Sequence, residues 1–134
     1  MATDISVRNL SGREVDAEIL FRTARQVLAA EAAELPALSI ALVDDSRIAG
    51  LNARLLNHAG PTDVIAFEAD GGEGEVIISI ETADRQAEEL GHSLGYELRY
   101  LLAHGVLHVL GWDDSTAELR DAMLRRQDEI ISIG

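Results

Sequence analysis

The sequence contains no cysteine and no lysine, and each absence excludes a class of chemistry. Without cysteine among its 134 residues, the chain has no disulfide scaffold, thiolate metal site, iron–sulfur centre or thiol nucleophile. Any bound metal must therefore be held by nitrogen and oxygen atoms. All 11 basic residues are arginine, and 24 carboxylates bring the net charge to −13. Such a surface disfavours nonspecific binding to phosphate backbones or anionic lipid, although a nucleic acid can still be held at a metal.

Long apolar runs are also missing. The N-terminus has no apolar signal core, and no run approaches the roughly 20 residues that span a bilayer. A hydrophobic fraction of 47% and a charged fraction of 26% are ordinary for a globular protein with its own core. We therefore expect a single domain over residues 1–134, in a cytoplasmic protein with no membrane partner.

Apolar periodicity and capping residues predict an order of elements. Ser46, Thr82, Ser93 and Ser115 are the expected helix caps. The predicted strands cover residues 5–9, 38–43, 64–67 and 75–80, and the predicted helices cover residues 13–33, 46–56, 82–90, 93–110 and 116–131. This order predicts an α+β fold, with a small mixed β-sheet covered by helices.

The segment HGVLHVLGWDD, residues 104–114, carries the strongest chemical signal. His104 and His108 are four residues apart on a predicted helix, so their side chains share a face. Gly111 permits a left-handed turn that brings Asp114 back towards both imidazoles. Two histidines and one carboxylate leave one tetrahedral position open, which is typical of catalytic rather than structural zinc sites. We therefore predict a single metal-binding cleft with His104, His108 and Asp114 as ligands.

Simpler interpretations of these residues stay open. Both histidines can be ordinary members of a core helix, and Asp114 can cap the following helix instead of binding a metal. Asp113 competes with Asp114 for the ligand position. The spacing also resembles the zinc-peptidase pattern, in which a glutamate general base follows the first histidine. Here that position is Gly105, which cannot take a proton, so peptidase chemistry is disfavoured.

The same segment resembles the H-G-x-L-H-x-x-G-[YW]-D-H signature of the YbeY endoribonucleases. Two further segments are similar to that family: GPTDVIAF at residues 60–67, and GEVIISIETADRQAEELGHS at residues 74–93. The resemblance runs in order over about residues 40–130. It implies an α+β fold with one Zn²⁺ per chain, held by His104, His108 and Asp114.

The resemblance further implies an endonuclease that cleaves single-stranded rRNA, not DNA, at the 3′ end of 16S rRNA. It also implies a role in ribosome quality control, with the small ribosomal subunit or its assembly factors as partners. Three positions depart from the family pattern: Asp114 replaces a histidine, Ala66 replaces a serine, and Leu56 replaces an arginine proposed to act on phosphate. Leu56 cannot supply a positive charge.

Arg54 and His58 flank Leu56 and are our candidates for that missing charge near the phosphate. Each also has a simpler interpretation, Arg54 as a solvated helix residue and His58 as a polar loop residue.

Leu56 and the net charge of −13 support an alternative function, a catalytically weak ribosome-assembly adaptor that keeps its metal for stability. Metal-dependent cleavage of RNA by the purified protein separates the two functions.

Overall fold

The computed structural model describes residues 3–56 and 62–133 of the chain. A four-stranded sheet forms its centre, with the strand order β1-β2-β4-β3. Strands β1, β2 and β4 are mutually parallel, and β3 runs antiparallel to β4. The strands are β1 (Asp4–Asn9), β2 (Ala37–Val43), β3 (Val64–Glu68) and β4 (Gly74–Ser79).

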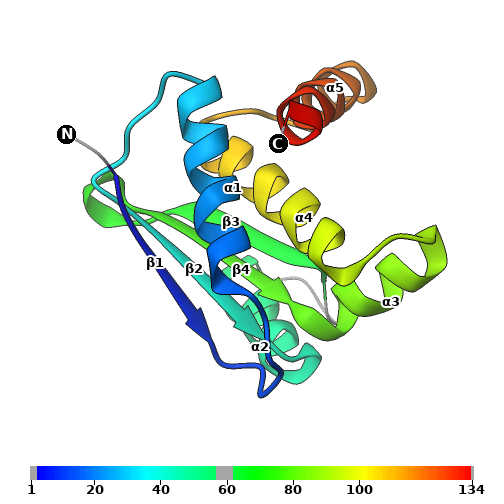
Figure 1. Cartoon of the computed structure of the whole chain (residues 1–134). Coiled ribbons are helices and arrows are strands. Elements are labelled where there is room, and N and C mark those ends of the chain that lie inside the picture. The colour runs from blue at the N-terminus through cyan, green and yellow to red at the C-terminus, as the bar shows by residue number, and fades with distance from the viewer. Residues whose placement is uncertain (1–2, 57–61, 134) are drawn as a thin grey trace.

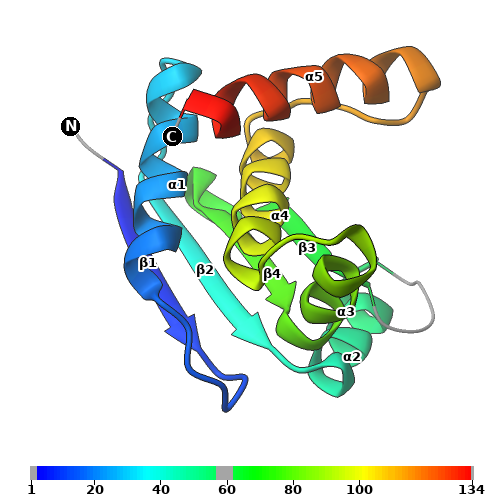
Figure 2. The same ribbon diagram turned by 45° about the vertical axis from the view of Figure 1, so that its right-hand side comes forward.

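Helices cover the sheet unequally on its two faces (Figure 1). The helices are α1 (Ala17–Ala30), α2 (Asp45–Leu56), α3 (Ile80–Leu90), α4 (Leu94–Val109) and α5 (Ala117–Ile133). A short 3₁₀ turn, η1 (Asp70–Gly72), joins β3 to β4. Helix α4 crosses the sheet beside α1, and α5 lies across the far end of both (Figure 2). Within the described ranges, no helix is long and apolar enough to cross a membrane.

Alternation along the strands divides the apolar residues between two cores. On β2, Leu38, Ile40 and Leu42 point into the large core beneath α1, α4 and α5. The intervening Ala41 and Val43 point to the opposite face, into a smaller cluster with α2. The predicted mixed sheet with helical cover is therefore confirmed, and α4 is the helix set deepest in the large core.

Gly105 lets α4 approach the sheet closely. A Cβ atom at this position would lie 2.7 Å from Cγ1 of Val76 on β4 and 3.4 Å from Val64 on β3. The glycine that disfavours peptidase chemistry is thus also favoured by packing, because any larger side chain would collide with the Val76 side chain beneath it. This contact fixes the height of the α4 histidines above the sheet.

The predicted order of elements is correct, but three predicted caps are wrong. Helix α3 begins at Ile80 and is capped by Ser79, because β4 passes into it directly. Ser79 accepts a hydrogen bond from the Thr82 amide, so Thr82 already lies within the helix. Ile80 belongs to the helix, although its apolar side chain continues the apolar run of the strand before it. Its side chain is apolar because it is buried, and not because it follows the period of two that is typical of a strand.

The caps of α2 and α5 also differ from the expected residues Ser46 and Ser115. Asp44 accepts from the Arg47 amide at the start of α2, and Thr116 accepts from the Leu119 amide at the start of α5. The expected cap of α4, Ser93, is confirmed, since it accepts from the Tyr96 amide. Where several Ser, Thr and Asp residues are adjacent, local sequence does not choose among them.

Candidate metal centre

The last two turns of α4 present His104 and His108 on one face. Their Nε2 atoms are 3.1 Å apart, and the rings stand edge to face, with centroids 4.7 Å apart and planes at 81°. Both side chains are partly exposed, His104 to 20% and His108 to 28%. The pair is therefore supported from below by the core and open to a ligand from solvent.

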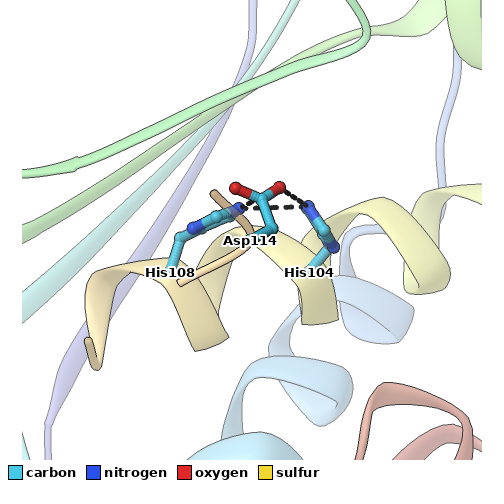
Figure 3. Close-up of side chains that lie close together, drawn as sticks. All are labelled: His104, His108 and Asp114. Atoms are coloured by element: carbon cyan, nitrogen blue, oxygen red, sulfur yellow. Dashed lines mark hydrogen bonds and ion pairs between the residues drawn. The ribbon is translucent and has the colours of Figure 1, made fainter. Parts of the chain in front are cut away.

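A glycine turn brings Asp114 to the same point (Figure 3). Gly111 has a φ of +104°, and the Gly111 and Trp112 amides donate to the carbonyls of His108 and Leu107. This arrangement ends α4 and reverses the chain. The Asp114 carboxylate then lies 3.3 Å from Nε2 of His108 and 3.9 Å from Nε2 of His104. Together these three residues, which we call the HHD cluster, could hold a metal ion.

Gln127, on α5, determines which nitrogen of His104 faces the cluster. Its side-chain amide donates to the Tyr100 carbonyl at 3.0 Å, so its oxygen is the atom that lies 2.9 Å from Nδ1 of His104. An amide oxygen only accepts, and Nδ1 must therefore carry the proton. Because Gln127 is fully buried, its orientation is fixed, and Nε2 of His104 keeps a free lone pair.

A backbone carbonyl does the same for His108. Nδ1 of His108 lies 3.1 Å from the Trp112 oxygen, so this nitrogen also carries the proton and Nε2 is again a bare acceptor. When both rings are neutral, their two Nε2 acceptors, 3.1 Å apart, cannot hydrogen-bond to one another. A cation between them satisfies both lone pairs, and two nitrogens bound to tetrahedral zinc are separated by about 3.3 Å. The donor set of two nitrogens and one oxygen therefore fits zinc.

The two aspartates that compete in the sequence have different surroundings. Asp113 accepts hydrogen bonds from the Ser115 hydroxyl at 2.8 Å and from the Ser115 amide at 2.9 Å. The hydroxyl bond holds the pKa of Asp113 below its usual value, and these bonds stabilise the turn. Asp114 faces the histidines, and the hydroxyl of Thr116 supplies the cap at the start of α5. The geometry thus favours Asp114 over Asp113 as the third donor.

The candidates for phosphate contact are less well placed. Arg54 is exposed in the last turn of α2, where it has no ion pair or hydrogen bond among residues 3–56 and 62–133. Leu56 is the last residue of that helix, and His58 lies outside the described residues. The roles of Arg54 and His58 therefore remain predictions.

The two groups that orient the histidine rings, the Trp112 carbonyl and the Gln127 side chain, were not predicted from the sequence. The Trp112 carbonyl leaves no trace in a sequence, because any residue has one. Gln127 did leave a signal, since it is a polar residue on the inward stripe of α5, between the buried Met123 and Ile130. A polar side chain buried among apolar neighbours has a partner, and here the partner is a histidine of the HHD cluster.

Several known proteins are similar to this chain over most of its length. The family described as Endoribonuclease YbeY matches residues 6–133. Curated proteins of that name include one from Pelotomaculum thermopropionicum, 40% identical with 95% of this chain and 94% of the relative covered. Another, from Thermobifida fusca, is 38% identical over 96% of this chain and 92% of its own. A solution structure of TM1509 from Thermotoga maritima shares the fold, with a TM-score of 0.61, 20% identity, and coverage of 95% and 90%.

Proposed function

Because the chain belongs to the Endoribonuclease YbeY family, we propose that it is a metal-dependent endoribonuclease that cleaves single-stranded RNA. The observation that carries this proposal is the pair of bare Nε2 acceptors 3.1 Å apart, with the Asp114 carboxylate beside them. Within the described residues, no other group of three or more His, Asp or Glu side chains converges in this way. Both histidines lie near the end of α4, whose other side is buried in the large core.

We propose that the metal is zinc, with one ion per chain held by His104, His108 and Asp114. A metal ion in such a site polarises the phosphate and lowers the pKa of bound water. The chain's own contribution is to fix the donors. Gln127 and the Trp112 carbonyl hold both rings with their lone pairs outward, and the Asp114 carboxylate supplies negative charge to balance a divalent cation.

Single-stranded rRNA is the proposed substrate, with cleavage at the 3′ end of 16S rRNA in the cytoplasm. The family name and the resemblance of the motifs support an RNA substrate. With a net charge of −13, the protein holds few phosphates by itself, so binding to naked RNA is expected to weaken only gradually with salt. The small ribosomal subunit, or its assembly factors, would then present the RNA. Arg54 or His58 is the proposed phosphate contact.

The experiment compares cleavage of a single-stranded 16S 3′-end RNA and its duplex by the purified protein. We expect cleavage of the single strand only, its loss with a chelator, and its return with zinc. His108→Ala removes one donor and is expected to abolish cleavage, and the double variant Arg54→Ala/His58→Ala is expected to reduce it. Full cleavage by the double variant excludes Arg54 and His58 as the phosphate contact.

If the protein binds metal stoichiometrically but does not cleave RNA, and if it also co-sediments with ribosomes, the adaptor function is supported instead.

A further inference from the structure

Strand β1 forms an open edge of the sheet. It pairs with β2 alone among the strands that the structure describes, and no helix lies beyond it in either view (Figures 1 and 2). Natural edge strands are commonly protected by proline, a bulge or charged side chains. β1 has the sequence DISVRN; it has no proline, and its two charged residues, Asp4 and Arg8, are opposite in sign, so they do not repel an antiparallel strand of the same sequence.

The free hydrogen-bonding groups on this edge can be identified. Asn9 is in register with Leu42, and the Leu10 amide donates to the Leu42 carbonyl at 2.8 Å. Backbone groups of alternate residues point to opposite sides of a strand. Residues 4, 6, 8 and 10 therefore face β2, and the amides and carbonyls of Ile5 and Val7 face outward, where another strand can pair with them.

The side chains of Asp4 and Arg8 are both exposed and lie on the sheet face opposite α1. Neither has a hydrogen bond or an ion pair within the described part of the chain. They are four residues apart on one strand, about 13 Å, which is too far for them to pair with each other. Their neighbours in register on β2 are Ala37 and Ala41, which offer no charged partner.

We propose that β1 pairs antiparallel with β1 of a second copy of this chain, about a two-fold axis at Ser6. In this register, Asp4 of each copy lies opposite Arg8 of the other, so both charges gain a cross-strand partner. Ile5 lies opposite Val7 of the second copy, and these two residues exchange their outward backbone hydrogen bonds. The two sheets become one continuous sheet.

The apolar side of the edge fits the same partner. Ile5 and Val7 point towards the helical face, where they pack against the large core. Thr3 and Ile5 line one hollow together with Arg25 and Leu28 of α1, and the Arg25 guanidinium lies 5.5 Å from the centre of the Phe21 ring. A second β1 would place its own Ile5 and Val7 beside this surface and remove apolar area from water.

Charge also favours a second copy over an acidic or a basic partner. The chain as a whole carries −13, yet β1 carries one acid and one base and is neutral. A strand with this pattern is complementary to itself when the two copies run antiparallel. Only a few residues of each strand meet in this contact, and two acidic molecules repel each other at longer range. We therefore expect a weak dimer.

The experiment is sedimentation equilibrium of the full chain at 0.15 M salt, from about 10 µM to about 1 mM. We expect a monomer–dimer equilibrium in this range. Asp4→Arg and Arg8→Asp each place like charges opposite one another, and each is expected to weaken self-association at least tenfold. An equimolar mixture of the two variants again joins opposite charges in both pairs, and it is expected to restore the dimer as a heterodimer.

A second variant blocks the edge without changing charge. Val7→Pro removes an amide that faces outward and leaves the β2 ladder in place, so it is expected to abolish the dimer while circular dichroism stays unchanged. The proposal is overturned if the protein is monomeric at 1 mM, or if the mixture of charge variants associates no better than either one alone. None of these variants touches the HHD cluster, so the outcome is independent of nuclease activity.

Discussion

Two polar clusters in this molecule differ in how completely their polar groups are hydrogen-bonded to one another. Where β2 and β4 pass into α2 and α3, the Asp45 carboxylate accepts from the hydroxyls of Ser79 at 2.6 Å and Thr82 at 2.7 Å. Arg85 completes the set with an ion pair of 2.9 Å. At the end of α4, by contrast, the Nε2 atoms of His104 and His108 face each other with no donor between them.

This difference separates a structural cluster from a ligand site. Burial alone raises the pKa of Asp45, but hydrogen bonds from Ser79, Thr82 and Arg85 outweigh it and hold that pKa below its usual value. Every group there has its partner, and the cluster ties the starts of two helices together. In the histidine pair, the Nδ1 donors point away from the cluster, to Gln127 and the Trp112 carbonyl, and the Nε2 acceptors face each other. Such a centre could hold a cation.

The largest expected difference is in metal binding, between a variant that removes one residue of the HHD cluster and a variant that removes one residue of the Asp45 cluster. Zinc at about 100 times its dissociation constant stabilises a protein that binds it by about 2.7 kcal/mol. We expect His104→Ala to lose this stabilisation and its bound metal entirely. Asp45→Ala is expected to keep one zinc per chain while losing about 1–3 kcal/mol of stability. Thermal unfolding with and without zinc, together with metal analysis, measures both, and loss of metal from Asp45→Ala would contradict the distinction.

The next largest effect is on the affinity for zinc, when the hydrogen bond from Nδ1 of His104 to Gln127 is removed. Gln127→Leu removes the acceptor that fixes the ring, and we expect the affinity for zinc to fall about 10- to 100-fold. Met123→Leu is the matched control, because Met123 is equally buried on the same helix and its substitution changes no polar contact. Zinc titration by calorimetry gives both dissociation constants. An unchanged constant for Gln127→Leu would show that the ring is positioned by packing alone.

The glycines of α4 and α2 are expected to affect folding stability alone, by an amount comparable to the loss at Gln127. Gly105→Ala forces a Cβ to within 2.7 Å of Val76, and we expect it to cost about 1–3 kcal/mol of unfolding free energy. Gly50, within α2, has no atom within 4 Å of its added Cβ. Gly50→Ala is therefore expected to gain about 0.5–1 kcal/mol through helix propensity. Denaturant unfolding measures both, and equal effects at the two sites would refute the close contact of α4.

The smallest effect is the pH dependence of the Asp45 cluster. A pKa held below its usual value of 3.8 gives stability that is present above that pH and is lost as the pH falls through the folded-state pKa. Asp45→Asn is therefore expected to be less stable than wild type at neutral pH, with the gap closing below pH 3.8. Asp84→Asn is the control, since the Asp84–Arg13 pair is exposed and contributes below about 1 kcal/mol. Urea unfolding across this pH range tests the expectation, and a constant gap would contradict it.

The element order and the identity of the HHD cluster could be predicted because both depend on short-range periodicity. Apolar runs at residues 38–43 and 75–80 place β2 and β4 to within a residue. The errors lie at the helix starts, where Ser79 caps in place of Thr82. There the choice among adjacent polar residues depends on how the strand enters the helix, which the local sequence does not encode.

The sequence by itself determined that His104 and His108 share a helical face and that a glycine turn follows, because 3.6 residues per turn and the conformational freedom of Gly111 are local properties. Only the tertiary structure decided which nitrogens face the centre. That choice depends on Gln127, 23 residues further along the chain from His104, and on the packing of α5 against α4. The open edge of β1 is likewise a property of the sheet order, since nothing within DISVRN tells whether another strand lies beyond it.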